Sequence, residues 1–202
     1  MSVFTILHVC VGNIRRSPMA ERLLVAALRS HVGDRVDELY RSHGAGTGTW
    51  HVGEAMQVRA AVEVRQRGGD PSGFAARHLT ADLIDESDLV LCATREQVAR
   101  VLELRPTARG RCYVLGELGR LLTSVAADPA GTPADPATAH ERGVALVAAL
   151  DAVRAGELPW SDDDLDDPYG QPQREYARAA DTIEATVIPL AAALVGRYAA
   201  AR

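Results

Sequence analysis

The sequence contains no lysine, and all 22 of its basic residues are arginines. A chain without lysine cannot form a Schiff base with a carbonyl substrate, and it lacks the lysine of a nucleotide-binding Walker loop. Both classes of enzyme are therefore excluded. The net charge is −5 and the sequence pI is about 5.7, which argues against a nucleic-acid binder with a broad basic surface.

Cysteine is also scarce, and Cys10, Cys92 and Cys112 lie far apart in the sequence. An odd number at wide spacings predicts neither a disulfide framework nor a paired-cysteine metal or redox site. No hydrophobic run reaches the roughly 18 residues that suggest a membrane span. The apolar stretch at 1–10 lacks the basic region of a signal peptide. We therefore expect a cytoplasmic protein.

The 202 residues, 47% hydrophobic and 24% charged, are typical of one globular domain. Short apolar runs alternate with amphipathic stretches, a pattern that favours a parallel sheet covered on both faces. We predict an α/β fold, a small doubly wound four-stranded parallel sheet with flavodoxin-like order 2-1-3-4 and helices on both faces. Strands are expected at 4–9, 39–44, 89–93 and 112–115, and helices at about 18–31, 55–67, 95–104, 139–155 and 173–200. The segment 125–140, rich in Ala, Pro, Gly and Asp, is interpreted as flexible.

The clearest motif is Cys10-Val-Gly-Asn-Ile-Arg-Arg-Ser17, of the form C-x5-R-S, between the first strand and a helix that Ser17-Pro18 begins. Backbone N–H groups converge in such a loop and, with the helix dipole, form an anion site. We expect the loop to hold Cys10 as a thiolate that accepts a hydrogen bond from Ser17, and we expect Arg16 to grip two phosphate oxygens. A cysteine that ends a strand is more often a small buried residue, but here Gly12 and Asn13 also suit a tight curl.

A thiolate that attacks a phosphate monoester needs a proton donor for the leaving oxygen. The candidate is Asp167 in Asp166-Asp167-Pro168-Tyr169, where the proline stiffens the loop and neighbouring carboxylates favour a protonated acid. By composition alone, the acidic run at 162–167 is more often a solvated loop or a cation site than a source of a catalytic acid.

At 9–21 and at 167–169 the sequence resembles the low-molecular-weight protein tyrosine phosphatases, which pair a V-C-x-G-N-x-x-R-S-P-M-A-E loop with a D-P-Y/F acid motif. The likeness also covers 46–50 and 76–92. It implies that Cys10 is the nucleophile, Arg16 the phosphate clamp and Asp167 the general acid and then the general base. It further implies that the substrate is bound by Val11, Gly12, Asn13, Ile14, Arg15, Ser17, Trp50 and Tyr169.

The resemblance implies a tyrosine-phosphorylated protein or peptide as substrate and phosphate as product, with no metal and no cofactor. Trp50 and Tyr169 would sandwich the phosphotyrosine ring. We expect no nucleic acid or membrane partner, and a monomer or weak dimer. The whole chain, 1–202, is interpreted as a single phosphatase domain with an insertion at about 125–160. An arsenate reductase of the same fold and a phospho-ligand binding module with little turnover remain alternatives.

The sequence departs from this family at several positions. Arg15 stands where many members carry a second loop cysteine, so we expect no protective disulfide for Cys10, and we interpret Arg15 as a surface residue. Gly44 and Phe74 stand where members support the loop asparagine with serine and histidine. We therefore expect Asn13 to be held by fewer hydrogen bonds and turnover to be lower, unless Ser42 or His43 takes over. His8, Cys92 and Cys112 are interpreted as structural.

Overall fold

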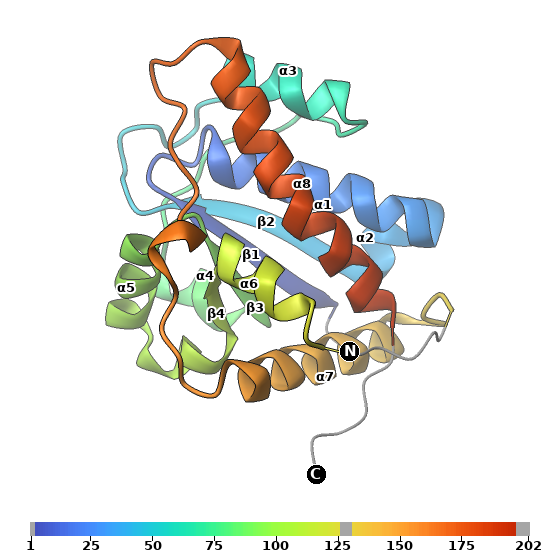
Figure 1. Ribbon diagram of the computed structural model, residues 1–202. Coiled ribbons are helices and arrows are strands. Elements are labelled where there is room, and N and C mark those ends of the chain that lie inside the picture. The colour runs from blue at the N-terminus through green and yellow to red at the C-terminus, as the bar shows by residue number, and fades with distance from the viewer. Residues whose placement is uncertain (1–2, 126–130, 197–202) are drawn as a thin grey trace.

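The computed structural model describes residues 3–125 and 131–196. Its centre is a four-stranded parallel sheet in the order β2-β1-β3-β4 (Figure 1). The strands are β1 (Phe4–Cys10), β2 (Tyr40–Gly46), β3 (Leu89–Cys92) and β4 (Cys112–Val114). The predicted fold class and the strand order 2-1-3-4 are confirmed.

Eight α-helices and three short 3-10 turns surround the sheet in the described part of the chain. The helices are α1 (Arg16–Val32), α2 (Val36–Leu39), α3 (Val58–Gln66), α4 (Ala81–Asp85), α5 (Arg95–Leu104), α6 (Leu115–Leu122), α7 (Pro136–Arg154) and α8 (Gln173–Val195). The turns are η1 (Gly33–Arg35), η2 (Pro106–Arg111) and η3 (Ser161–Asp163). The sequence predicted α5 with its observed bounds, and it missed α6, which follows β4 without a turn between them. The prediction for the last helix extended to residue 200, and 197–202 lie outside the described residues.

Side chains of the strands alternate between two hydrophobic clusters, one on each face of the sheet. Phe4 and Ile6 pack on the side of α1, α6, α7 and α8, whereas Leu7 and Val9 pack on the side of α4 and α5. Because both faces are covered, β1 is buried along its whole length, as its continuous apolar sequence indicates. The loop that follows β1 is thus built on a strand that is buried along its whole length.

Helix α7 belongs to the core, and it confirms the helix predicted at about 139–155, although its first turn lies within the segment 125–140 that was interpreted as flexible. Its residues Leu146 and Leu150 are fully buried in the cluster that contains Phe4. Asp135 caps the helix by accepting a hydrogen bond from the Thr138 N–H, and Pro136 occupies its first turn. The helix therefore begins about three residues before the predicted start. Residues 126–130 of the predicted flexible segment lie outside the described residues.

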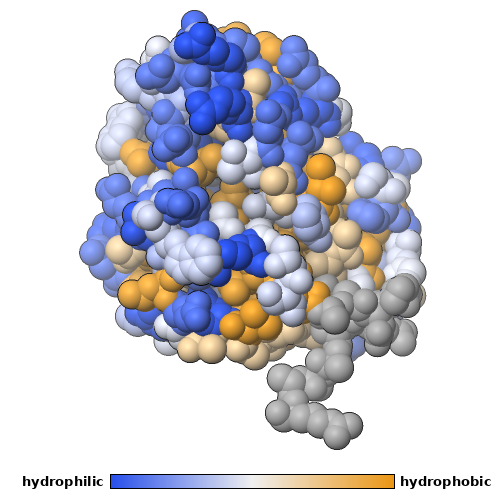
Figure 2. All heavy atoms as spheres, in the orientation of Figure 1, coloured by the Kyte–Doolittle hydropathy of each residue, from blue (hydrophilic) through white to orange (hydrophobic). Residues whose placement is uncertain are grey.

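The surface is hydrophilic at the end formed by α3 and the start of α8, and hydrophobic patches lie lower on the same face (Figure 2). Among the exposed apolar side chains are Leu158 and Trp160, in the segment after α7. This segment runs from α7 to the edge of the sheet where β1 ends (Figure 1). No helix of the described ranges has the length and apolar character needed to cross a membrane.

Candidate active site

The loop between Cys10 and Arg16 presents its amide groups to its own interior. The carbonyl oxygens of Cys10 and Val11 point outward, where they accept hydrogen bonds of 3.0 and 2.9 Å from the N–H groups of Thr47 and Gly48. The Ile14 carbonyl likewise accepts from Gln57 N at 2.9 Å. In a trans peptide the N–H points opposite to the carbonyl, so the N–H groups that follow these carbonyls face the inside of the loop. The result is a cradle of donors that suits an anion.

The sulfur of Cys10 lies at the base of this cradle, and the residue as a whole is 2% exposed. Its Sγ is 3.0 Å from the Ser17 hydroxyl and accepts a hydrogen bond of 3.3 Å from the Asn13 backbone N–H. Hydrogen bonds from such donors favour a thiolate over a thiol. The structure therefore places Cys10 and Ser17 in the contact that the sequence motif predicts.

Arg16 extends across the site and is almost fully buried. Its Nη1 donates to the Leu165 carbonyl at 2.9 Å, and its Nη2 donates to Asp167 Oδ2 at 2.8 Å. Its Nε is buried and has no hydrogen-bond partner among the described residues. A buried guanidinium N–H without a partner is costly, and an anion held in the cradle would supply the missing acceptor.

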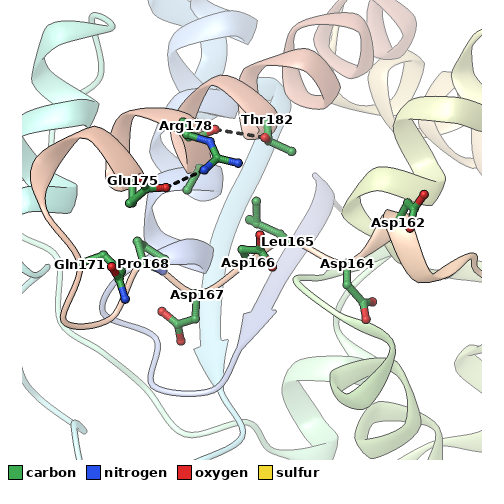
Figure 3. A pocket seen from close by; sticks show the side chains of 11 residues that line it. Asp162, Asp164, Leu165, Asp166, Asp167, Pro168, Gln171, Glu175, Arg178 and Thr182 are labelled. Atoms are coloured by element: carbon green, nitrogen blue, oxygen red, sulfur yellow. Dashed lines mark hydrogen bonds and ion pairs between the residues drawn. The ribbon is translucent and has the colours of Figure 1, made fainter.

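Asp167 comes to the same place from the far end of the chain. The N–H of Leu165 donates to the Ala93 carbonyl at 2.8 Å, which ties this acid segment to the end of β3. Asp167 Oδ1 accepts from the Tyr169 N–H at 3.1 Å and lies 3.3 Å from Arg15 Nε. Its carboxylate points away from Glu175 and Arg178 of α8 (Figure 3). The side chain is 33% exposed, so it is accessible to a bound substrate.

The other carboxylates of this run do not form one cluster with Asp167. Asp163 pairs with Arg120 at 3.0 Å, and Asp164 pairs with Arg95 at 3.1 Å. Asp163 and Asp164 are therefore each paired with an arginine, rather than crowded against Asp167 as the sequence suggested. The hollow drawn in Figure 3, about 440 Å³, lies between the acid segment and α8, and no residue of the loop 10–17 lines it. It is thus a neighbouring hollow, separate from the cradle.

Two exposed aromatic side chains flank the loop. Trp50 is 65% exposed and follows the segment whose amides bind the loop carbonyls, and Tyr169 is 70% exposed beside the acid. The Arg15 guanidinium carbon lies 4.5 Å from the centroid of the Tyr169 ring, and the Arg15 side chain is only 13% exposed. Arg15 is therefore not the exposed surface residue that the sequence suggested, because its side chain packs between Asp167 and Tyr169.

His51 is a site neighbour that the sequence analysis missed. Its ring lies against the loop so closely that a Cβ on Gly12 would be 2.9 Å from His51 Cδ2. Its Nδ1 is 2.7 Å from Glu54 Oε2, and its ring centroid is 6.2 Å from that of Trp50. The only local signal was its position beside Trp50.

Asn13 is fully buried and has a φ of 52°, the left-handed conformation expected for the curl of the loop. Its Oδ1 accepts from the Arg77 backbone N–H at 2.9 Å, and its Nδ2 donates to Ser17 Oγ at 2.8 Å. Both ends of the amide are thus bonded, through the Arg77 backbone and Ser17 rather than through side chains at Gly44 and Phe74. Arg77 Nη2 also donates to the Gly44 carbonyl at 3.0 Å and lies 2.9 Å from His43 Nδ1.

The other residues considered as supports serve elsewhere. Phe74 packs under the Arg22 guanidinium, 5.9 Å from ring centroid to carbon, and Ser42 Oγ is 3.0 Å from His8 Nε2. Burial lowers the pKa of His8 to about 3, with a smaller contribution from His43. Burial likewise raises the pKa of Glu21 to about 7, although Arg22, Arg77 and the Gly44 N–H oppose that shift. Beneath the loop, therefore, His8 is neutral at pH 7.

The two remaining cysteines lie together on adjacent strands, with their sulfur atoms 3.9 Å apart. Both belong to the cluster on the α4 and α5 face, whereas Cys10 belongs to the opposite cluster. Burial, with Cys112 beside it, raises the pKa of the Cys92 thiol well above its usual range. A neutral buried thiol on the far face is poorly suited to a relay from Cys10, so the geometry argues against the arsenate reductase alternative.

Comparison with known proteins agrees with this arrangement. The family model described as low molecular weight phosphotyrosine protein phosphatase matches residues 5–120. The probable low molecular weight protein-tyrosine-phosphatase AmsI of Erwinia amylovora is 33% identical over 112 residues, which cover 55% of this chain and 71% of that protein. Low molecular weight protein-tyrosine phosphatase A of Mycobacterium bovis is 46% identical over 81 residues, which cover 38% of this chain and 47% of that protein.

Solved structures share the fold over nearly the whole chain. The crystal structure of AmsI has a TM-score of 0.63 at 22% identity and covers 93% of this chain and 91% of its own. The arginine phosphatase YwlE of Geobacillus stearothermophilus has a TM-score of 0.61 at 22% identity, with coverage of 94% and 91%. The family match spans more than half of the sequence and includes the Cys10 loop. This chain therefore belongs to the family of low molecular weight phosphotyrosine protein phosphatases.

Proposed function

We propose that this chain hydrolyses phosphotyrosine in proteins or peptides through a cysteinyl-phosphate intermediate. The observation that carries the proposal is the meeting of three groups at one anion cradle. These groups are the Cys10 sulfur at its base, the Arg16 guanidinium at the end of the same loop, whose Nε has no partner among the described residues, and the Asp167 carboxylate, which Arg16 Nη2 contacts at 2.8 Å. A nucleophile, a cationic clamp and an acid are the groups that displacement at phosphorus requires.

In the first step the Cys10 thiolate attacks phosphorus, so that the sulfur–phosphorus bond forms while the bond to the aryl oxygen breaks. Asp167 gives its proton to the departing aryl oxygen, which leaves as a neutral phenol. The loop N–H groups and Arg16 bind the equatorial oxygens, whose charge they stabilise in the transition state. The hydrogen bond from Ser17 Oγ to the sulfur stabilises Cys10 as the group that leaves in the next step.

In the second step Asp167, now a carboxylate, accepts a proton from a water molecule that attacks the phosphorus. The sulfur–phosphorus bond breaks, the thiolate is restored and inorganic phosphate is released. Asp167 thus acts as acid and then as base, and the site returns to its starting protonation state. The chain needs no further reactant besides water.

The substrate class follows from the depth and walls of the site. Cys10 is buried, so the phosphoryl group must stand on a side chain long enough to reach it, and phosphotyrosine is longer than phosphoserine. Trp50, after the segment that binds the loop carbonyls, and Tyr169, beside Asp167, are both exposed, and we propose that they stack on the aromatic ring of the substrate. We also propose that the chain acts as a single phosphatase domain, since α7 packs into the same core as α1 and α8.

The test is hydrolysis of matched peptides that carry phosphotyrosine, phosphoserine or phosphoarginine by the wild type and by Cys10→Ser, Asp167→Asn and Cys112→Ala. We expect phosphotyrosine hydrolysis that Cys10→Ser abolishes and Cys112→Ala leaves unchanged, since Cys112 lies in the core away from the loop. With 4-nitrophenyl phosphate, whose leaving group departs without a proton, Asp167→Asn should accumulate phosphate on the Cys10 peptide, which mass spectrometry detects. A preference for the phosphoarginine peptide would contradict phosphotyrosine as the substrate. Turnover of arsenate with thioredoxin would indicate an arsenate reductase. Binding of a phosphopeptide without turnover would indicate a binding module.

A further inference from the structure

Arg15 touches both functional side chains of the acid segment. Its Nε is 3.3 Å from Asp167 Oδ1, and its guanidinium lies over the Tyr169 ring at 4.5 Å. An arginine can do both at once because its planar guanidinium stacks on a ring while its edge donates to a carboxylate. At this position of the loop, one side chain connects the phosphate cradle to the acid.

The two oxygens of Asp167 have different partners. Oδ1 lies near two donors, the Tyr169 N–H at 3.1 Å and Arg15 Nε at 3.3 Å, whereas the only hydrogen bond of Oδ2 within the described chain comes from Arg16 Nη2. A proton on Oδ1 would displace the hydrogen bond from the Tyr169 N–H and would face the Arg15 cation 3.3 Å away. A proton on this carboxyl therefore belongs on Oδ2 once Arg16 turns to the phosphoryl group. Oδ2 is therefore the oxygen that can deliver a proton.

Delivery of that proton requires Oδ2 to leave Arg16. In the proposed reaction the Arg16 guanidinium serves the phosphoryl oxygens, and Oδ2 must face the aryl oxygen instead. When that exchange takes place Asp167 loses its contact with Arg16 but keeps the contacts at Oδ1. Arg15 is the only side chain among these partners that holds the acid in both arrangements, because the remaining Oδ1 donor is a backbone N–H.

We propose that Arg15 is a positioning residue that anchors Asp167 through Oδ1, with Tyr169 stacked on its guanidinium, so that Oδ2 is presented to the leaving oxygen. This inference rests on the proposed phosphatase function. In this role Arg15 assists protonation of the leaving group and does not bind the phosphate. An experiment can separate these two roles.

The experiment compares kcat/KM for two aryl phosphates that differ in their leaving group. Phenol, with a pKa of about 10 like tyrosine, needs protonation to leave, whereas 4-nitrophenolate leaves readily as an anion. Arg15→Gln removes both the positive charge and the planar guanidinium, whereas Arg15→Lys retains the charge but not the planar guanidinium. Arg29→Gln, an exposed arginine on the same helix, is the matched control.

We expect Asp167→Asn to lower kcat/KM for phenyl phosphate by about 100-fold and for 4-nitrophenyl phosphate far less. Arg15→Gln should show the same selectivity with a loss of about tenfold on phenyl phosphate, because a displaced acid still protonates but does so poorly. Arg15→Lys should recover only part of this loss. The inhibition constant of inorganic phosphate should stay within about twofold of the wild type, since the cradle is intact.

A double variant tests whether Arg15 acts through the acid. Arg15→Gln combined with Asp167→Asn should be no slower on phenyl phosphate than Asp167→Asn alone. Additive losses, equal losses on both substrates, weaker phosphate inhibition or an unchanged Arg15→Gln would each overturn the inference. A wild type that hydrolyses neither substrate would instead contradict the proposed function, so the two failures are distinct.

Discussion

The side-chain amide of Asn13 occupies the space into which a Cβ on Gly44 would project, with its Nδ2 2.6 Å from that position. The contact means that the glycine and the present arrangement of the phosphate loop depend on each other. Addition of a side chain here therefore disturbs the loop rather than supporting it.

We predict that Gly44→Ser lowers kcat by about tenfold, because Asn13 must move and its bonds to Arg77 and Ser17 then lengthen. Steady-state kinetics on an aryl phosphate measure the effect. Gly44→Ala is the matched control, since it adds the Cβ without the hydroxyl and should lose as much. A gain of turnover in the serine variant alone would show that the hydroxyl does support the loop.

The buried His8 makes the folded protein sensitive to acid. Its pKa is about 3 in the fold and about 6.5 in an unfolded chain, so folding keeps it neutral. The free energy of unfolding is therefore not reduced by His8 above pH 6.5. As the pH falls from 6.5 toward 3, the unfolded chain binds a proton that the folded protein does not, and the free energy of unfolding decreases. The loss approaches about 1.4 kcal/mol for each pH unit in that range.

Urea unfolding at pH 7.5, 6.0 and 5.0 checks this prediction. The variant His8→Gln should lose stability less steeply with acid than the wild type does, even though it is less stable at pH 7.5. The exposed His31, changed to Gln, is the control and should follow the wild-type slope. Parallel slopes for wild type and His8→Gln would refute the assignment. His43, with a pKa that burial lowers to about 4, accounts for part of the slope that remains.

Gly143 is expected to be intolerant of alanine, against the usual rule for helices. Alanine in a helix interior is favoured over glycine by about 1 kcal/mol. At this position, however, a Cβ would lie 2.3 Å from the Phe4 ring, and overpacking of a core costs about 1–3 kcal/mol. We predict a net loss of stability, with a fall in Tm of about 2–4 °C per kcal/mol.

Differential scanning calorimetry of Gly143→Ala measures the change. Val144→Ala, at an exposed position of the same helix, should leave Tm nearly unchanged. Combining Gly143→Ala with Phe4→Leu should restore part of the loss, because the smaller side chain makes room. A more stable Gly143→Ala would mean that α7 and β1 are less closely packed than the structure shows.

Oxidation of Cys10 by peroxide is predicted to be poorly reversible. A sulfenic acid at Cys10 finds no second thiol in its own loop, because Arg15 stands there, and Cys92 lies on the other face of the sheet as an unreactive thiol of raised pKa. Further peroxide then produces sulfinic acid. Activity recovered by dithiothreitol after peroxide should therefore be a small fraction of the untreated activity.

The matched variant is Arg15→Cys, which places a thiol where relatives have one and should recover a larger fraction of its own untreated activity. Mass spectrometry of the Cys10 peptide should find two added oxygen atoms in the treated wild type. Inorganic phosphate during treatment should protect the thiol, because it occupies the cradle. Complete recovery of the wild type with thiol would rule out the prediction.

Features that depend on the local sequence pattern could be predicted. The four strands, their order and the contact between Cys10 and Ser17 follow from alternating apolar runs and from a loop between a strand and a helix. The start of α7 was missed by about three residues although Asp135-Pro136 is a helix signal, because the Ala- and Pro-rich composition around it suggested a loop.

Contacts between residues distant in the sequence were not predictable in the same way. The stacking of Arg15 on Tyr169, the support of Asn13 by Arg77 and the pairing of the Cys92 and Cys112 sulfur atoms each depend on how separate elements meet. For Gly44 and Phe74, comparison with a family pattern indicated what was missing but not which residue compensates. Such compensation is set by packing, and a single position in a sequence carries no sign of it.

The hydrogen bond from Leu165 N to the Ala93 carbonyl has a consequence for how this fold can evolve. It fixes the proton donor to the same sheet edge that carries the nucleophile, so the position of Asp167 does not depend on the length of chain between β3 and the acid segment. Helices can be added, lengthened or exchanged within that stretch while the distance between the two reacting groups stays constant. A change in α7 would therefore affect the stability of the core, into which Leu146 and Leu150 pack, more than the geometry of the two reacting groups.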